Sequence, residues 1–459
     1  MTGAKVSSEA GRGTEAERKD RRALVLHPLI TRHSSKDGAG AVRRPENRLA
    51  ESEGLARAIA LDVVGGEVVP VSRPRAATLF RGGRIEELKG WIAADEIGLV
   101  VIDHALTPIQ QRNLEHAWDC KVIDRTGLIL EIFGARAWTR EGRLQVEFAA
   151  LSYQRSRLVR SWTHLERQRG GLGFVGGPGE SQIEVDRRLI AERLTRIRRQ
   201  LDAVVRHRDL HRRARRRVPY PVVALVGYTN AGKSTLFNRL AGAAVDAEDK
   251  LFATLDPTLR GVTLPSGRRI MLADTVGFIS DLPTDLIAAF RATLEEVREA
   301  DLVVHVRDAA DPEAEAQRED VHAVLRDLDL GPAVERGLIE VLNKVDLLPP
   351  AERAEIVNAS HRRDRAVAVS ALTGDGCAAL LDLLDDELGA ARRVVELAIP
   401  HADGATLAWL YRHGEVLSRV DEDAATRLRV GLDPVEAARL EYMRTSRRES
   451  TCEHPPAGS

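Results

Sequence analysis

Residues 227–235 read Gly227-Tyr-Thr-Asn-Ala-Gly-Lys-Ser-Thr235, and they follow the apolar run Val222-Val-Ala-Leu-Val226. The stretch fits the pattern G-x-x-x-x-G-K-[ST], with a predicted strand before it and a predicted helix after it. In that context the motif indicates a loop that binds the phosphates of a nucleotide. The sequence therefore predicts an α/β domain around this strand, with a nucleoside triphosphate and Mg²⁺ as its ligands.

Each residue type in this phosphate loop has a physical use. Gly227 and Gly232 permit backbone angles and a close approach that a Cβ would block. Successive backbone N–H groups are expected to surround the phosphates, helped by the positive end of the following helix. Lys233 is expected to bridge the β- and γ-phosphates, and Ser234 to bind Mg²⁺ through its hydroxyl. The predicted contacts are Gly227, Tyr228, Thr229, Asn230, Ala231, Gly232, Lys233, Ser234 and Thr235.

The base is indicated by Asn343-Lys-Val-Asp346, which follows the mostly apolar run 339–342. The Asp346 carboxylate can accept from both N1–H and N2–H of guanine, a donor pair that adenine lacks. Asn343 would donate to the opposite edge of the base, and the apolar stem of Lys344 would cover a ring face. Ser370-Ala-Leu372 follows another short apolar run and suits a backbone N–H that meets guanine O6. The predicted guanine contacts are Asn343, Lys344, Val345, Asp346, Ser370, Ala371 and Leu372.

Two further segments are expected to sense the γ-phosphate. Asp274-Thr-Val-Gly277 ends a predicted strand, so Asp274 would hold Mg²⁺ through a water and the Gly277 N–H would meet the γ-phosphate. Residues 252–258 lie in the interval of a first switch, where Thr254 or Thr258 would complete the Mg²⁺ shell and order the loop with GTP. The predicted contacts here are Phe252, Ala253, Thr254, Leu255, Asp256, Asp274, Thr275, Val276 and Gly277.

The position just past Asp-x-x-Gly is informative because many GTPases place a water-orienting glutamine there. Here it is Phe278, followed by Ile279, and neither side chain can orient a water. No catalytic side chain is therefore assigned. We expect slow intrinsic hydrolysis, raised by a partner that orders the switches or supplies a group in trans.

Composition bounds the class of protein. The chain has 459 residues, 43% hydrophobic and 30% charged, with a net charge of −1. No apolar run approaches the length of a membrane span, and the polar N-terminus does not resemble a secretory signal. Three cysteines, at positions 120, 377 and 452, can build neither a disulfide framework nor a metal cluster at their spacing. We expect a cytoplasmic, reduced monomer.

The regions before and after the nucleotide domain show different patterns. Apolar runs alternate with helical patterns up to about residue 135, which predicts a small, mainly parallel α/β domain. The predicted strands are 23–26, 68–71, 99–102 and 121–123, and the helices 49–60, 84–94 and 108–117. Pro70 confines its strand to a sheet edge or a strand end. At the other end, strands at 394–399, 416–420 and 426–430 with a helix at 406–411 predict a small α+β domain.

Residues 139–217 predict an antiparallel helical hairpin. Apolar residues follow 4-3 spacing in two stripes, Leu144, Phe148, Leu151, Leu158, Trp162 and Leu165, then Ile190, Leu194, Ile197, Leu201 and Val204. Between residues 186 and 217 there are 13 arginines and four acids. This local excess suits a polyanion such as RNA, although a solvated helix face would look the same.

The break between the two stripes, residues 169–182, is rich in glycine and contains G-x-G-x-x-G at Gly171, Gly173 and Gly176. A dinucleotide site is excluded because the segment follows a helix and not a strand. A hairpin tip needs only a few residues. The length of this loop, 170–181, therefore favours a contact element over an inert connector.

The assembled motifs resemble the HflX family of GTPases. The resemblance rests on Asp124-Arg-Thr-Gly-Leu-Ile-Leu-Glu-Ile-Phe133, Glu141-Gly-Arg-Leu-Gln-Val-Glu147, Trp162-Thr-His-Leu-Glu-Arg-Gln168 and Gly177-Pro-Gly-Glu-Ser-Gln-Ile-Glu-Val-Asp-Arg-Arg188, together with the phosphate loop and switch motifs. It covers roughly residues 22–432. It implies a multidomain α/β chain with an N-terminal α/β domain, a coiled-coil hairpin, a Ras-like G domain with a mainly parallel sheet, and a small α+β C-terminal domain.

The expected boundaries are a disordered arm at 1–21, the N-terminal domain at 22–138, the hairpin at 139–217, the G domain at 219–392, the C-terminal domain at 393–444 and a disordered tail at 445–459. The resemblance also implies ribosome-stimulated GTPase activity on the large ribosomal subunit, with the hairpin loop reaching toward the peptidyl-transferase region. It implies a role in splitting stalled or hibernating ribosomes. By the family pattern Thr254 is the magnesium-linked switch threonine.

Two departures from the family pattern bear on function. Ser181 replaces a usual threonine and keeps the hydroxyl. Arg84 stands where the family usually has lysine in a Gly-x-Gly-Lys stretch, which argues against a second nucleotide activity in the N-terminal domain. Two other functions stay open, a tRNA-modification-linked GTPase and a GTP-dependent switch for a protein partner. The first would need a further chemical site that the sequence does not display, and the arginine-rich hairpin favours RNA over the second.

Overall fold

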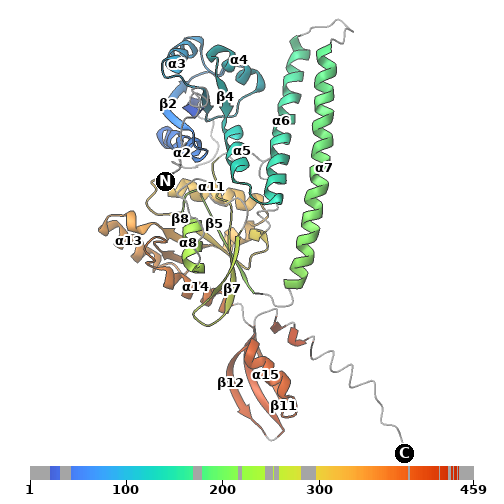
Figure 1. Cartoon of the computed structure of the whole chain (residues 1–459). Coiled ribbons are helices and arrows are strands. Elements are labelled where there is room, and N and C mark those ends of the chain that lie inside the picture. The colour runs from blue at the N-terminus through green and yellow to red at the C-terminus, as the bar shows by residue number, and fades with distance from the viewer. Residues whose placement is uncertain are drawn as a thin grey trace, which may run out of the picture.

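The structure, a computed structural model, contains three sheets and a long helical hairpin (Figure 1). It describes residues 21–30, 43–168, 178–215, 220–242, 252, 258–280, 296–336, 338–390, 393–422 and 424–432, together with 436–437, 439–441 and 443. The multidomain α/β class predicted from the sequence is confirmed, with the predicted hairpin between two α/β units.

The N-terminal sheet is parallel and has the strand order β2-β1-β3-β4. Its strands are β1 (Arg22–Ile30), β2 (Asp62–Val71), β3 (Leu99–Ile102) and β4 (Lys121–Asp124), and its helices are α2 (Pro45–Ala58), α3 (Gly82–Ala94) and α4 (Pro108–Trp118). β2 lies at the sheet edge, where Pro70 needs no ladder partner on its outer side. Apolar residues of α3 and α4 cover one face of this sheet, while α2 packs on the other.

Helix α5 (Arg125–Arg136) is an element that the strand and helix pattern did not predict. Asp124 caps its start by accepting from the Gly127 N–H at 2.8 Å. The helix leads into α6 (Arg140–Gln168), which runs beside α7 (Pro178–Arg215) as the predicted hairpin (Figure 1). Leu194 and Ile197 are buried between the helices, and Arg193 and Glu147 form an ion pair of 2.6 Å across them.

The central sheet has the order β10-β9-β8-β5-β7-β6, in which only β6 is antiparallel to its neighbour. Its strands are β5 (Val222–Gly227), β6 (Thr258–Thr263), β7 (Arg269–Asp274), β8 (Leu302–Asp308), β9 (Ile339–Asn343) and β10 (Ala366–Ala368). The helices are α8 (Lys233–Ala241), α11 (Ala314–Asp327), α12 (Gly331–Arg336), α13 (Pro350–Ser360) and α14 (Cys377–Ala390), with a 3-10 turn η1 (Val345–Leu347). Apolar residues of α8 and α14 pack on one face and those of α11 on the other.

The C-terminal sheet is antiparallel with the order β11-β13-β12. It consists of β11 (Arg393–Pro400), β12 (Glu415–Asp421) and β13 (Ala425–Leu432), with α15 (Gly404–His413) beside it. Leu397, Leu410 and Val430 form the centre of its own small core. This unit matches the α+β arrangement expected from the sequence.

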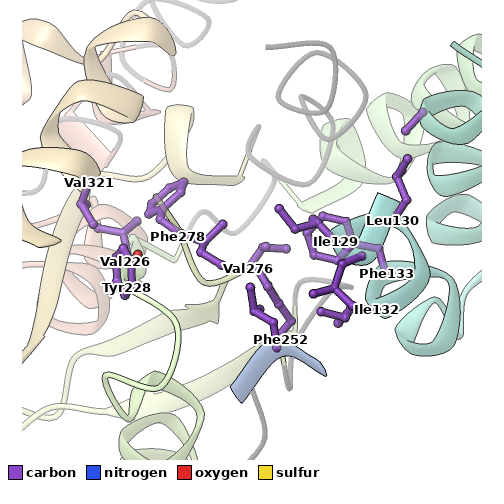
Figure 2. Packing of buried hydrophobic residues seen from close by; sticks show 14 of the residues in the cluster. Ile129, Leu130, Ile132, Phe133, Val226, Tyr228, Phe252, Val276, Phe278 and Val321 are labelled. Atoms are coloured by element: carbon purple, nitrogen blue, oxygen red, sulfur yellow. The ribbon is translucent and has the colours of Figure 1, made fainter. Parts of the chain in front are cut away.

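One hydrophobic cluster crosses the boundary between the two parallel sheets. It joins Leu55 of α2 and Ile129 and Phe133 of α5 to Phe278 and Val321 of the central domain. Figure 2 shows Ile129 and Phe133 on one side of the cluster and Phe278 and Val321 on the other. Continuous burial of this kind fixes the orientation of the packed elements, because close-packed interiors leave little room for sliding. The phosphate loop therefore lies at a domain junction and not on an isolated G domain.

Candidate functional site

The phosphate loop follows β5, a strand flanked by β7 and β8, and it ends at the start of α8. Gly227 has φ of 152°, and a Cβ there would lie 2.1 Å from the Val306 carbonyl oxygen. Gly232 has φ of 88°, and its Cβ would lie 2.2 Å from Asn343 Nδ2. Both glycines are thus required by conformation and by space, which is the reason the sequence motif gives for them.

The Lys233 side chain folds back over the loop and is only 6% exposed. Its Nζ donates to the carbonyl oxygens of Tyr228 at 2.7 Å and Gly227 at 3.1 Å. Burial lowers the pKa of Lys233 from 10.5 to about 8, although the Asp274 carboxylate favours the charged form. A phosphate group beside Lys233 would add negative charge that stabilises the ammonium form of the lysine. The geometry therefore suits an anionic ligand.

Ser234 and Asp274 come together from the start of α8 and the end of β7. The Ser234 hydroxyl donates to Asp274 Oδ2 at 2.7 Å, and Asp274 is 2% exposed. A hydroxyl and a carboxylate are hard oxygen ligands of the kind that Mg²⁺ prefers. The residues present therefore fit the metal that the motifs imply.

The second switch segment, residues 274–280, lies directly over the phosphate loop. The Phe278 N–H donates to the Gly227 oxygen at 3.0 Å, and the Thr229 N–H donates to the Phe278 oxygen at 2.7 Å. A Cβ on Gly277 would lie 3.1 Å from Lys233 Nζ, so this glycine sits beside the lysine. The Phe278 side chain is 2% exposed and packs in the shared cluster with Val226 and Val321 (Figure 2). In this structure the side chain thus lies in the core, and its lack of a role in orienting water stays a prediction.

Asn343 braces two loops of the site against each other. Its Nδ2 donates to the Ala231 oxygen at 2.8 Å, and its Oδ1 accepts from the Ala371 N–H at 2.9 Å. From the sequence, Asn343 is expected to donate to the edge of the base. A backbone N–H of residues 370–372 is expected to meet guanine O6. The structure instead gives Asn343 and the Ala371 amide partners within the protein, and base contacts of these groups stay predictions.

Lys344 and Asp346 occupy the turn after β9. Lys344 has φ of 63° and its Nζ lies 2.8 Å from Asp308 Oδ2, an ion pair that holds the lysine stem in place. Asp346 lies in η1 and is partly exposed, so its carboxylate is accessible to a ligand. The turn thus presents one carboxylate beside a fixed lysine, as the guanine assignment requires.

Part of the predicted first switch lies outside the described residues, namely Ala253, Thr254, Leu255 and Asp256. Phe252 is described, is 3% exposed and packs edge-on against Phe133 of α5 with ring centroids 4.8 Å apart. Thr258, the other threonine considered, is the first residue of β6 and pairs with Asp274 across the β6–β7 ladder. Residues 170–177 of the hairpin loop also lie outside the described part.

Sequence reasoning missed a group of polar residues that surrounds the outer side of the phosphate loop. The Tyr228 hydroxyl donates to a Glu51 carboxylate oxygen and accepts from Arg43 Nη1 at 3.1 Å and from the Ser280 N–H at 2.8 Å. Arg125 Nη2 donates to Ser280 Oγ at 2.9 Å. We call Arg43, Glu51, Arg125, Tyr228 and Ser280 the interdomain network. Of its members, Tyr228 was expected as a phosphate-loop residue and Arg125 entered only within the family motif Asp124-Arg-Thr, while their contacts with each other's domains were not predicted.

Two other charged groups have structural explanations. Arg84 forms ion pairs with Glu67 and Glu87, which occupy its guanidinium. His305, His322 and Glu340 bring potential metal-ligating atoms within 4.8 Å of one another, a cluster that the sequence did not suggest. Glu340 already pairs with Arg307 at 3.2 Å. Further arginines, Arg318 and Arg363, each lie 3.6 Å from the same carboxylate, so this environment opposes a cation.

A strand–loop–helix phosphate cradle, an Asp-x-x-Gly segment over it and an Asn-Lys-x-Asp turn at the end of β9 in the same sheet define a GTPase of the phosphate-loop class. Comparison with family models divides the chain in four. The matches are to "GTP-binding GTPase N-terminal" at residues 46–134, "GTP-binding GTPase Middle Region" at 136–215, "50S ribosome-binding GTPase" at 222–344 and "HflX C-terminal domain" at 355–452.

Curated relatives agree with these matches. GTPase HflX of Magnetococcus marinus is 49% identical over 424 residues, covering 92% of this chain and 94% of the relative. GTPase HflX of Escherichia coli is 43% identical over 395 residues, covering 85% and 91%. The chain belongs to the HflX family of GTPases and is a GTP hydrolase. A GTP-binding protein of Sulfolobus solfataricus, solved with GDP, aligns at 20% identity and a TM-score of 0.42, covering 80% of this chain and 98% of that one.

Proposed function

We propose that this GTPase acts with Mg²⁺ on the large ribosomal subunit in the cytoplasm and splits or rescues stalled or hibernating ribosomes. Support comes from the family description "50S ribosome-binding GTPase" over residues 222–344 and from the arginine-rich hairpin. Among the described helices, none has the length and apolar character needed to cross a bilayer. Nucleotide binding is assigned to the loops around Lys233, Asp274 and Asp346, with Ser234 and Thr254 as metal ligands and Asp274 acting through a water.

The observation that carries the ribosome proposal is the charged surface of α7. Seven of its arginines are exposed, Arg187, Arg188, Arg193, Arg196, Arg198, Arg199 and Arg206. Its neighbour α6 covers one side of the helix, where Leu194 and Ile197 are buried. Arg193 and Arg198 also contact α6, through Glu147 and the Phe148 ring, and the other exposed arginines lie on the rest of the helix surface. A long helix surface with this many exposed guanidinium groups matches the phosphate backbone of an RNA better than a small or apolar partner.

Sedimentation with purified large subunits tests this proposal. We expect co-sedimentation in a non-hydrolysable GTP analogue, less in GDP, and a strong decrease as salt rises because arginine–phosphate contacts release counterions. The double change Arg196→Glu and Arg199→Glu should weaken binding at least about tenfold. A matched control changes two exposed arginines outside the hairpin, Arg362 and Arg412, to glutamate. Binding that ignores the nucleotide, or equal losses in both variants, would contradict the proposal.

A second experiment separates the hairpin loop from nucleotide binding. Shortening the loop 170–181 should leave GDP affinity unchanged and abolish stimulation of GTP hydrolysis by large subunits. Stimulation that survives would make the loop a connector only. Stimulation by tRNA, or by a protein fraction free of ribosomes, would favour one of the two alternative functions, a tRNA-modification-linked GTPase or a switch for a protein partner.

A further inference from the structure

The end of the second switch segment is held by the N-terminal domain. Arg125 of α5 donates from Nη2 to the Ser280 carbonyl oxygen at 3.1 Å and to Ser280 Oγ at 2.9 Å. Ser280 Oγ in turn lies 3.0 Å from Glu51 Oε2 of α2. Ser280 is 4% exposed and lies only two residues after Phe278, so these contacts restrain a segment that already covers the phosphate loop.

Arg125 is itself fixed by groups of the N-terminal domain. Its Nη1 donates to Asp103 Oδ1 at 2.5 Å and to Ser52 Oγ at 3.2 Å, and its Nη2 lies 3.1 Å from Glu51 Oε2. Burial opposes the charge, but Asp103 and Glu51 hold the pKa of Arg125 above its ordinary value. The guanidinium therefore stays charged, and its contacts to Ser280 are charge-assisted and rigidly placed.

Tyr228 ties the same group to the phosphate loop. Its hydroxyl accepts from the Ser280 N–H at 2.8 Å and donates to Glu51, while the Arg43 guanidinium lies 5.2 Å from the centre of the ring. Arg43 also forms an ion pair of 2.5 Å with Asp320 of α11. A cavity of about 640 Å³ borders the network and is lined by residues of α2, the phosphate loop and the segment after β8. The N-terminal domain thus contacts the nucleotide loop itself as well as the switch that follows it.

The opposite end of α5 contacts the first switch segment. Phe133, eight residues after Arg125, packs edge-on against Phe252, and both rings are buried. Figure 2 shows Ile129 and Phe133 on one side and Phe252 and Val276 on the other, with the apolar side chains facing each other. One short helix therefore meets both segments whose positions depend on the γ-phosphate. The same helix continues into α6 of the hairpin after only a short turn.

We propose that α5 is a positioning element for GTP turnover, in which Arg125–Ser280 and Phe133–Phe252 couple both switch segments to the N-terminal domain and the hairpin. Neither residue of α5 touches the reacting atoms; each acts through the switch residue that it holds. Coupling of this kind is reciprocal. If the α5 contacts change the free energy of nucleotide binding, then bound nucleotide changes the free energy of the α5 contacts by the same amount. The proposal requires only the GTPase activity and not the ribosome.

Two serines bonded to the same arginine provide a matched test. Ser280→Ala removes a hydroxyl between Arg125 and the switch, whereas Ser52→Ala removes one between Arg125 and α2. We expect Ser280→Ala to speed the dissociation of fluorescent GDP from the full chain at least about fivefold, the lower range of coupling seen between sites. Ser52→Ala should leave that rate within about twofold. Equal rates in the two variants would overturn the coupling through the Ser280 hydroxyl, because the bond from Arg125 to the Ser280 carbonyl oxygen is present in both variants.

Two phenylalanines test the apolar contact in the same way. Phe133→Leu keeps the site apolar but loses the edge-on contact with Phe252, and Phe80→Leu makes a similar change in the core of the N-terminal sheet near Trp118. We expect faster GDP dissociation for Phe133→Leu than for Phe80→Leu at comparable losses of thermal stability. Equal dissociation rates would show that α5 stabilises the domain without positioning the switch.

Hydrogen exchange measures the reciprocal effect in the unaltered protein. In wild type, the amides of 125–136 should exchange at different rates with GDP and with a non-hydrolysable GTP analogue, and this difference should shrink in Ser280→Ala. Amides of the C-terminal sheet, which lies in a separate core, serve as the internal reference. Identical protection of α5 in both nucleotides would overturn the proposal even if a variant failed to fold.

Discussion

Asn343 Nδ2 donates to the carbonyl oxygen of Ala231 at 2.8 Å, so the end of β9 supports the phosphate loop directly. Gly232 makes this contact possible, because any Cβ at that position would collide with the same Nδ2 atom. The end of β9, the phosphate loop and the segment at Ala371 are therefore joined through one side-chain amide that is only 1% exposed.

Asn343→Ala should weaken both folding and nucleotide binding. The change leaves the Ala231 carbonyl and the Ala371 amide without their partner in a buried site, at a cost of about 1–3 kcal/mol in the free energy of unfolding. Urea unfolding and fluorescent-GDP titration would measure the two effects. Asn358→Ala, at an exposed position on α13, is the control and should stay within about 0.5 kcal/mol. Nearly wild-type stability of Asn343→Ala would argue against the bracing role.

Asp346→Asn should change the preferred base from guanine to xanthine. The carboxylate accepts from two N–H groups of guanine, whereas an amide can donate to the 2-oxo group that xanthine carries instead of the amino group. Displacement of a bound fluorescent nucleotide by GTP and by XTP measures the change in base preference. The affinity for GTP is expected to fall at least about a hundredfold. Retained GTP selectivity would refute the assignment of Asp346.

The strand and helix pattern predicted most elements because apolar spacing alone determined them. The strand at 99–102 agrees in both bounds, and the C-terminal strands agree within a few residues. Helix α5 was not predicted because its start depends on an Asp124 cap and its exposed positions, Glu131, Gly134 and Ala135, include only one polar residue, so no polar stripe marks the helix. Local spacing cannot identify a helix whose surroundings are supplied by two other domains.

The same limit applies to the site. Motif spacing placed the phosphate loop, Asp274 and Asp346 at or after the ends of predicted strands, and parallel strands bring their carboxyl ends to one edge of the sheet. Motif spacing could not predict the hydrogen bond between Tyr228 and Glu51. The two residues are 177 positions apart in the sequence, and neither is unusual in its local context. Contacts between domains depend on how surfaces dock, which a linear pattern does not contain.

Nucleotide affinity should fall as pH rises through about 8, because Lys233 loses its proton there in the nucleotide-free protein. A bound phosphate favours the ammonium form, so binding above pH 8 takes up a proton and Kd rises by up to about tenfold per pH unit. The free energy of unfolding changes in the opposite direction. The pKa of Lys233 is about 8 in the folded state and 10.5 in the unfolded state, so between these values the unfolded state binds more protons. The free energy of unfolding therefore increases as pH rises from about 8 to 10.5.

Titration of fluorescent GDP from about pH 7 to about pH 9, with calorimetry in two buffers of different ionisation enthalpy, measures the proton uptake. Lys233→Arg is the informative control. Arginine stays charged over this range, so its Kd should be higher but independent of pH. A flat profile for wild type, with no proton taken up, would show that Lys233 remains charged without nucleotide.

Phe278→Gln should not create a faster GTPase. The side chain at this position is buried in the cluster with Val226 and Val321, so a glutamine there would bury an amide among apolar groups. We expect the free energy of unfolding to fall by about 1–3 kcal/mol while intrinsic GTP hydrolysis stays slow. Phe278→Leu keeps the position apolar and should lose less stability than the glutamine variant. Thermal melting and single-turnover hydrolysis of GTP would compare the three proteins. A glutamine variant that hydrolyses GTP more than about tenfold faster than wild type would mean that the segment swings outward during turnover and that residue 278 reaches the attacking water.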